Sequence, residues 1–297
     1  MAYRVGVVGA GALGLLYAGL LGAKVYTRTA EQADLIGARG GVTVVQDGRE
    51  TRVAVQAVPV PVLEADFEGL DLVVFTVKSY QLPDLAEVIR EIPVQTPLLF
   101  LQNGIGHLEW LEGLGHETIL VGTCEHGAGK LDGASVEWRG VGRTNWAVFR
   151  GNLEAGLRDF LMGQNGFPFV EKSDFEAMLY DKLLINAVVN PLTAVLGVRN
   201  GALIHNAFFY EVFEKFGREV ADVLMRDEQW LERLTGVCEA TAMNYSSMAT
   251  DVMEKRRTEI DSILGAVIRL AKQQGKDALI SEILYAQVKG LEGEYLQ

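Results

Sequence analysis

The sequence contains few cysteines and has a deficit of positive charge. Only Cys124 and Cys238 occur among 297 residues, far apart in the chain, whereas a disulfide framework or a zinc site needs more ligands at paired spacings. Lys and Arg total 27 against 39 Asp and Glu, which gives a formal net charge of −12. Such a surface repels phosphate backbones and anionic lipid. We therefore expect no metal, no nucleic-acid partner and no membrane partner.

Long apolar runs are also lacking. No segment approaches the roughly 20 uninterrupted apolar residues that a membrane span requires. In the N-terminal apolar stretch, Arg4 is followed by a glycine-rich turn and by no small-residue cleavage site. We therefore expect a buried first strand rather than a signal peptide, and a cytoplasmic protein. The length corresponds to about two domains of roughly 150 residues each.

Proline is scarce and glycine abundant, and both are unevenly distributed. Of 33 glycines, 25 lie in residues 1–168, as do six of the seven prolines. Turn-forming residues separate short alternating elements, whereas long helices exclude them. The sequence thus predicts a turn-rich domain over 1–170 and a helical domain over 171–297. A capping box that starts at Ser173 marks the first helix of the second domain.

The first domain opens with a glycine-rich fingerprint. The apolar run Tyr3 to Val8 predicts a strand buried on both faces, and it leads through GAGALG into a helical pattern. In such a turn Gly9 permits the tight bend, Gly11 lets the backbone approach a pyrophosphate, and Gly14 allows close helix packing. The motif predicts a dinucleotide site formed by Gly9, Ala10, Gly11, Ala12, Leu13 and Gly14.

The residue after the second strand bears on which dinucleotide is bound. Arg28 lies 19 positions after Gly9. An acidic residue at about this distance suits the ribose 2′-hydroxyl of NAD, whereas an arginine suits a 2′-phosphate. The pattern favours NADP(H), and the nearby Glu31 leaves NAD open as the alternative.

Short strands and helices then alternate through the first domain. Strands are predicted at 42–45, 53–58, 72–77, 98–101 and 119–122, a helix at 82–91, and one or two hairpins within 128–149. This alternation is typical of an α/β doubly wound sheet of the Rossmann type, whose ligands lie at the carboxyl ends of the strands. Lys78 and Asn103 follow the carboxyl ends of two such strands. The Lys78 ammonium could contact cofactor phosphate or ribose, and the Asn103 amide could contact the nicotinamide end or the substrate. Either is equally consistent with an ordinary loop residue.

In the second domain, a lysine and two asparagines share one helix face. Lys182, Asn186 and Asn190 fall four residues apart in an otherwise apolar pattern. Because an unpaired buried polar group costs about 1–3 kcal/mol, these groups should face a wet cleft or a polar ligand. The alternative is an exposed polar stripe. Pro191 directly after Asn190 predicts that the helix ends or kinks there.

Two further polar segments follow, Asn244 to Met248 and Arg256 to Asp261. Considered without other information, Arg256, Arg257 and Glu259 fit a solvated charge cluster. Apolar residues from 260 to 271 then form a helical stripe, with Gly275 as its predicted stop.

Together these motifs resemble the ketopantoate reductase family, the 2-dehydropantoate 2-reductases. The matching segments are GAGALG (9–14), TVKSYQ (76–81), QNGIG (102–106), KLLINAVVNPLTA (182–194), NYSSM (244–248) and RRTEID (256–261). The resemblance implies a Rossmann domain followed by an all-helical domain, with the active site in the cleft between them. It implies NADPH-dependent reduction of 2-dehydropantoate to (R)-pantoate, a step of pantothenate and coenzyme A biosynthesis.

The resemblance also implies roles for individual residues. Lys182 matches the general acid, and Glu259 matches an acidic catalytic residue near the nicotinamide end of the cofactor. The implied substrate-binding positions are Asn103, Asn186, Asn190, Asn200, Asn244 and Ser247. The implied cofactor-binding positions are residues 9–14, Arg28, Lys78, Asn103, Ala128 and Glu259.

Two other functions fit the same pattern less closely. One is an NADP-dependent reductase of another 2-keto acid, and the other is a dinucleotide-sensing protein without turnover. A sensor is expected to lack part of the lysine and asparagine row, which is intact here. The apolar helical half is also compatible with a homodimer.

Overall fold

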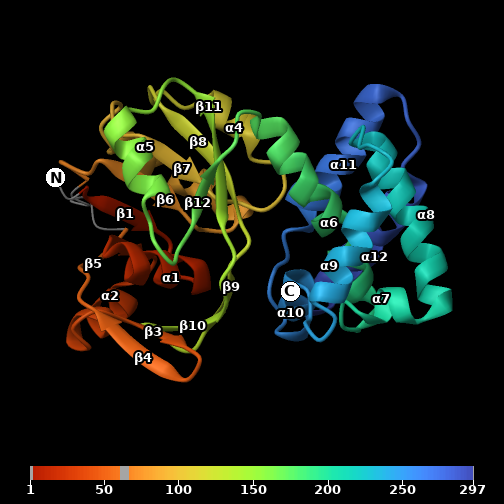
Figure 1. Ribbon diagram of the computed structural model, residues 1–297, viewed down its shortest axis with the longest axis horizontal. Helices are drawn as coiled ribbons and strands as arrows, with labels where there is room; N and C mark the ends of the chain where they lie inside the picture. The colour runs from red at the N-terminus through yellow and green to blue at the C-terminus, as the bar shows by residue number, and fades with distance from the viewer. Residues whose placement is uncertain (1–2, 61–66, 297) are drawn as a thin grey trace. The chain divides into compact units, whose positions relative to one another are not determined.

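The computed structural model describes residues 3–60 and 67–296. The chain forms two compact units. Unit 1 comprises Met1–Gln102 and Trp110–Met178, and unit 2 comprises Asn103–Glu109 and Leu179–Gln297. The division at Met178 falls later than the predicted boundary at 170, and the short segment 103–109 belongs with the second unit. Figure 1 colours the sheet-containing unit from red to green and the helical one mainly from green to blue.

The main sheet of unit 1 has eight strands in the order β12-β11-β8-β7-β6-β1-β2-β5. Its strands are β1 (Val5–Val8), β2 (Lys24–Thr27), β5 (Ala57–Pro59), β6 (Leu72–Phe75), β7 (Leu98–Phe100), β8 (Ile119–Cys124), β11 (Thr144–Arg150) and β12 (Phe169–Glu171). From β5 to β8 all neighbours pair in parallel, and β11 pairs antiparallel with β8. The order reverses beside β1, as in a doubly wound sheet, so the predicted fold class is confirmed.

A second sheet, in the order β4-β3-β10-β9, was not predicted. It consists of β3 (Val42–Gln46), β4 (Arg49–Val53), β9 (Gly127–Lys130) and β10 (Ser135–Gly140). Residues 128–149 do contain one hairpin, β9–β10, but β10 also pairs in parallel with β3. The predicted strand 53–58 is wrong as a single element, because β4 ends at Val53 in this sheet and β5 begins at Ala57 in the other.

The helices of unit 1 cover the sheets, as Figure 1 shows for α1, α2 and α5. The helical segments are α1 (Ala12–Leu21), α2 (Ala30–Ala38), the 3₁₀ turns η1 (Ser79–Gln81) and η2 (Pro83–Leu85), α3 (Ala86–Arg90), α4 (Leu108–Glu112) and α5 (Ala155–Met162). The predicted helix 82–91 is thus a 3₁₀ turn followed by a short α-helix. Helix α1 is the most deeply buried of them, since Leu15, Leu16 and Tyr17 are fully enclosed.

Unit 2 is helical, as predicted. Its helices are α6 (Phe175–Leu196), α7 (Ala202–His205), α8 (Ala207–Val223), α9 (Trp230–Ala240), α10 (Ser247–Met253), α11 (Ile260–Gln274) and α12 (Leu279–Tyr295). Gly275 ends α11 in the left-handed region at φ 66°, and its N–H donates to the Ala271 carbonyl, so the predicted stop is confirmed.

Helix α6 begins one residue later than predicted and does not end at Pro191. The N-cap is Asp174 and not Ser173, because the Asp174 carboxylate accepts from the Ala177 amide at 3.0 Å. The helix also continues past Pro191 for five residues to Leu196. Val189 and Leu192 on either side are buried, and this packing outweighs the local preference for a break.

Helix α6 is also long and apolar enough to cross a membrane by length and composition. However, 61% of its most apolar window is buried. Such burial is typical of a core helix.

A buried histidine in segment 103–109 makes stability depend on pH. His107 is 3% exposed, and neither ring nitrogen has a hydrogen-bond partner among the residues described. Burial lowers the pKa of His107 from 6.5 to about 4. In the unfolded chain the His107 imidazole is protonated below about pH 6.5, whereas in the folded protein it is protonated only below about pH 4. The free energy of unfolding therefore falls as the pH is lowered from 6.5 to 4.

We expect the free energy of unfolding to drop by about 2 kcal/mol from this residue between pH 7 and pH 5. Urea unfolding at the two pH values measures the drop, and His107→Leu should remove most of it. The surface substitution His205→Gln is the control and should keep the wild-type difference. An unchanged pH dependence in His107→Leu would show that His107 is not the source.

Candidate functional site

The glycine-rich turn of unit 1 is held by close backbone contacts. Gly9 has φ 103°, which favours glycine, and a Cβ there would meet Val77 at 2.8 Å. A Cβ on Gly14 would overlap the Gly9 carbonyl oxygen. The Thr76 hydroxyl lies at hydrogen-bond distance from the Val8 and Gly9 carbonyls, at 3.1 and 3.0 Å. These two glycines are therefore required by the packing of the chain itself.

Gly11 behaves differently. It is exposed, its φ of −76° is open to any residue, and a Cβ there would meet nothing within 4 Å. No steric contact in the described chain thus requires glycine at the N-cap of α1, where other capping residues are equally favourable. A side chain at this place would fill the space in front of the helix N-terminus, where phosphate groups bind in dinucleotide sites. The residues present fit a dinucleotide pyrophosphate.

Strands β7, β6, β1 and β2 are adjacent and parallel, so the residues that come after their carboxyl ends lie at the same edge of the sheet. Gly9 follows β1, Arg28 follows β2, Thr76 follows β6 and Gln102 follows β7. Gln102 donates to the Phe75 and Val77 carbonyls at 3.1 and 3.0 Å, which ties the ends of β6 and β7 together. Lys78 follows Val77 directly, is half-buried and caps the start of η1.

Glu31, the acidic residue that fits the alternative cofactor NAD, lies in the first turn of α2. Hydrogen bonds from its own backbone amide and from the Thr29 hydroxyl lower the pKa of Glu31. Thr29 caps the same helix, since its side chain accepts from the Gln32 amide. Arg28 is exposed just before this cap.

Two side chains that the sequence did not single out hold the fingerprint turn. The Ala10 carbonyl accepts from Gln32 Nε2 at 2.9 Å and from Lys130 Nζ at 3.1 Å. Gln32 also donates to the Gly133 carbonyl at 2.8 Å. Ala128 lies in β9, two residues before Lys130. The strand that contains Ala128 therefore supplies a cation to the turn.

In unit 2 the predicted polar row lies along α6. Lys182 and Asn186 are half-buried, and Asn190 is 5% exposed. Asn186 Nδ2 donates to Asn103 Oδ1 at 3.5 Å, and Asn103 Nδ2 in turn donates to Glu259 Oε2 at 2.9 Å. Three residues predicted from separate motifs are thus joined in one hydrogen-bonded chain.

The interpretation of residues 256–259 as a solvated charge cluster is wrong for Glu259, which is 5% exposed. It holds for the two arginines, which are exposed and form ion pairs. Arg256 pairs with Asp251 at 3.0 Å, and Arg257 lies 3.6 Å from Asp261. The RRTE pattern could not separate a buried carboxylate from its exposed neighbours.

A carboxylate on α12 fixes the backbone beside Glu259. Glu292, 3% exposed, accepts from both the amide and the hydroxyl of Thr258, each at 2.7 Å. Lys289 pairs with Glu292 at 2.8 Å. These contacts define the position of residue 258 and hence that of Glu259. No sequence motif indicated Glu292, because it lies 34 positions from its partner.

The other end of the row meets the 244–248 segment. Asn190 Nδ2 donates to Ser247 Oγ at 3.4 Å. The preceding Ser246 caps α10 by accepting from the Ala249 amide, and it accepts from the buried Thr193 hydroxyl at 2.7 Å. Thr193 and Ser246, neither of which was predicted, thus position the exposed Ser247 beside α6.

Asn200 and Asn244 share a second arrangement. The Asn200 amide donates to the Asn244 carbonyl at 3.0 Å, and Asn200 Nδ2 donates to Thr241 at 2.9 Å. Asn200 is buried, whereas Asn244 is exposed. The structure therefore ties Asn200 to the turn that presents Asn244, and a direct contact of Asn200 with substrate stays a prediction.

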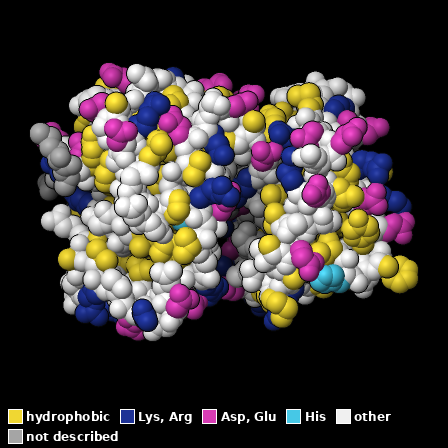
Figure 2. All heavy atoms as spheres, viewed as in Figure 1, with side chains coloured by type: hydrophobic (Ala, Val, Ile, Leu, Met, Phe, Trp, Pro, Cys, Tyr) yellow, Lys and Arg dark blue, Asp and Glu magenta, His cyan; other side chains and the backbone are white. Residues whose placement is uncertain are grey.

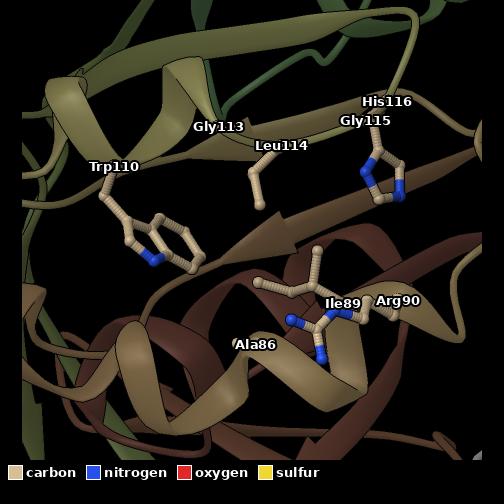
Figure 3. Close-up of a pocket in the computed structure, with 8 residues that line it drawn as sticks. All are labelled: Ala86, Ile89, Arg90, Trp110, Gly113, Leu114, Gly115 and His116. Carbon is tan, nitrogen blue, oxygen red and sulfur yellow. The ribbon is translucent and has the colours of Figure 1, made fainter.

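A cavity of about 240 Å³ lies elsewhere in unit 1, between α3 and the segment after α4. In Figure 3, Trp110, Leu114 and His116 point toward Ile89 and Arg90. None of these is a predicted site residue. Over the described ranges there is no group of three or more His, Cys, Asp or Glu side chains placed to hold a metal ion.

Comparison with known proteins assigns both units to one family. Residues 5–151 match the family model described as ketopantoate reductase PanE/ApbA, and residues 174–292 match its C-terminal counterpart. The chain is 39% identical over 296 residues to the 2-dehydropantoate 2-reductase of Listeria innocua, covering 98% of this chain and 97% of the relative.

Solved structures agree. The crystal structure of a probable 2-dehydropantoate 2-reductase from Bacillus subtilis superposes with a TM-score of 0.84 at 35% identity, covering 97% of this chain and 100% of the other. A D-mandelate dehydrogenase solved with NADH and anilino(oxo)acetate shares the fold, with a TM-score of 0.87 at 23% identity over 99% of this chain and all of that one. The chain therefore belongs to the ketopantoate reductase family and is a dinucleotide-binding oxidoreductase.

Proposed function

We propose that this protein reduces 2-dehydropantoate to (R)-pantoate with NADPH, a step of pantothenate and coenzyme A biosynthesis. The observation that carries the proposal is the polar row of α6. Lys182, Asn186 and Asn190 lie on one face, and the two amides contact the other motifs of the family through Asn103 and Ser247. A ketone, a carboxylate and a hydroxyl are the groups that such a row of donors recognises.

Residues of unit 1 are proposed to hold the dinucleotide. The open space at Gly11 and the N-terminus of α1 suit its pyrophosphate, and Arg28 suits a ribose 2′-phosphate. Arg28 is exposed directly after β2, and this cation favours NADPH over NADH. Lys78 and Ala128 are proposed as further cofactor contacts, and Asn103 and Glu259 as contacts of its nicotinamide end.

The residues of unit 2 are proposed to act on the substrate. The nicotinamide, when bound, supplies a hydride to the ketone carbon. Negative charge then develops on the ketone oxygen, and the Lys182 ammonium both stabilises this charge and gives the oxygen a proton. The neutral amine left on Lys182 regains its proton from solvent.

Neutral donors complete the proposed substrate site. Asn186, Asn190 and Ser247 hydrogen-bond the carboxylate and hydroxyl of the keto acid without adding a charge that would change the pKa of the lysine. Asn244 is exposed in the adjoining turn and is proposed as a further contact, with Asn200 beneath it.

We further propose that the protein works in the cytoplasm on this small molecule, without nucleic-acid or membrane partners, and that its helical half supports a homodimer. The acidic net charge of −12 supports the first part. Figure 2 shows acidic and basic side chains interspersed over the visible face, without a basic patch.

A related substrate is the second candidate, because a D-mandelate dehydrogenase solved with anilino(oxo)acetate shares this fold. The test is NADPH and NADH oxidation measured by absorbance, with ketopantoate, pyruvate and phenylglyoxylate compared side by side. The proposal requires the highest kcat/KM for ketopantoate with NADPH. A higher value for another keto acid would favour the second candidate, and no turnover with any of them would favour a sensor.

Lys182→Ala should lower kcat about 10²–10⁴-fold, because the developing oxyanion loses its proton donor. Its Kd for NADPH, followed by nicotinamide fluorescence, should change little. Lys215→Ala, which removes an exposed lysine of α8 that forms an ion pair with Glu211, is the control and should keep wild-type turnover. Wild-type kcat in Lys182→Ala would rule out the general-acid role.

Substituting the two glycines that flank the start of α1 should separate binding from folding. Gly11→Val should lower the melting temperature only slightly, through a weaker N-cap, but bind NADPH at least tenfold more weakly, because its side chain enters the space left for the phosphates. Gly14→Val should lower the melting temperature, because its side chain overlaps the Gly9 carbonyl. If Gly11→Val binds NADPH normally, the pyrophosphate does not lie there.

A further inference from the structure

Two cations without an ion-pair partner among the described residues are near the fingerprint turn in the fold: Lys130 contacts the turn, and Arg28 follows the neighbouring strand β2. Arg28 follows β2, and Lys130 ends β9. Within residues 3–60 and 67–296 neither forms an ion pair. Their charges act on each other, since the positive charge of Arg28 contributes to lowering the pKa of Lys130. In a protein with a net charge of −12, a cation held at a glycine-rich turn by the Ala10 carbonyl, with a second unpaired cation after the neighbouring strand, indicates a place for an anion.

The acidic residues near these cations are engaged elsewhere. Asp132 forms an ion pair with Arg39 at 2.7 Å, and its other carboxylate oxygen accepts from the Ala134 amide at 2.8 Å. Its charge raises the pKa of Lys130, but desolvation of the ammonium is the larger effect and the net direction is downward. Glu31 is held by Thr29 and by its own amide. Neither carboxylate neutralises the pair at hydrogen-bond distance.

The position of Lys130 is fixed by its contact with the turn. Its Nζ donates to the Ala10 carbonyl at 3.1 Å. An ammonium has three N–H donors, so two remain for a ligand. The residue is exposed to solvent, so an anion can reach it. Gln32 holds the same carbonyl from the side of α2, which keeps the acceptor in place.

We propose that Lys130, together with Arg28, binds the 2′-phosphate of the adenosine ribose and so helps to select NADP over NAD. The inference rests on the proposed use of NADPH. A phosphate monoester has a charge of about −1.5 to −2 at pH 7, which two cations balance better than one. The pyrophosphate is common to both dinucleotides and belongs at Gly11 and the N-terminus of α1. The Arg28 end of the turn is where the 2′-substituent lies.

A purely structural role for Lys130 predicts a different result. If its ammonium only braced the Ala10 carbonyl, its loss would weaken the binding of both dinucleotides equally, because both use the turn. Loss of a contact to the 2′-phosphate weakens the binding of NADPH but not that of NADH. The ratio of the two dissociation constants therefore separates these roles.

The experiment measures binding to the full chain without keto acid. NADPH and NADH are titrated by nicotinamide fluorescence, and 2′,5′-ADP and 5′-ADP by calorimetry. Lys130→Met should raise the Kd of NADPH and of 2′,5′-ADP about tenfold or more, and change the Kd of NADH and 5′-ADP less than twofold. Arg28→Met should act in the same direction. Lys130→Arg, which keeps the charge, should retain most of the wild-type preference, and Lys215→Met should change none of the four constants.

An equal loss of affinity for both members of each pair in Lys130→Met, or no loss at all, would overturn the proposal. So would a wild-type protein that binds 5′-ADP as tightly as 2′,5′-ADP. Because these ligands bind without a keto acid, the result is independent of the substrate. A protein that prefers 2′,5′-ADP through Lys130 but does not reduce ketopantoate would retain this inference and lose the proposed reaction.

Discussion

The packing of residues 103–109 against the first turn of α11 is the contact on which the site in unit 2 depends. A Cβ on Gly104, which has φ 79°, would overlap the Ser262 carbonyl, and the Ile105 amide donates to that carbonyl at 3.1 Å. Ser262 Oγ donates to the Asn103 carbonyl at 3.1 Å. This close approach of two backbones holds Asn103 within hydrogen-bond distance of Glu259, so the amide is positioned by packing and not by its own loop.

The same contact explains why amides are used beside the carboxylate. The carboxyl oxygens of Glu259 are buried, and a buried acceptor without a donor costs free energy, so a neighbouring amide N–H is needed to satisfy them. Asn103 donates to Glu259 and accepts from Asn186, so its amide is held in one orientation by partners on both sides. Glu292 fixes the neighbouring residue 258 by two further hydrogen bonds. A lysine in place of Asn103 would pair with Glu259 but would remove the acceptor for Asn186.

Local patterns predicted the elements whose structure is decided locally. Neighbouring residues are enough to predict the first strand before Gly9, the alternation of strands and helices, and the end of α11 at Gly275. The sheet β4-β3-β10-β9 was missed because β3 pairs with β10, about 90 positions away in the sequence. At Pro191 the local preference for a break was outweighed by burial along α6. The N-cap is Asp174, one residue after the predicted Ser173, and a capping motif does not resolve a difference of one residue.

Motifs similarly indicated the candidate site residues but not their surroundings. The sequence does not show that Glu259 is buried whereas Arg257 is exposed, because the partner of Glu259, Asn103, is 156 positions away. It does not distinguish Lys130 from other surface lysines either, because Lys130 contacts Ala10, 120 positions away. The fingerprint itself combines two kinds of information. Gly9 and Gly14 are required by contacts within the chain and would be glycine whatever the ligand. No contact within the described chain requires glycine at position 11, and two side chains, Gln32 and Lys130, donate to the Ala10 carbonyl. Specificity for one dinucleotide therefore has to come from the residues gathered around the turn.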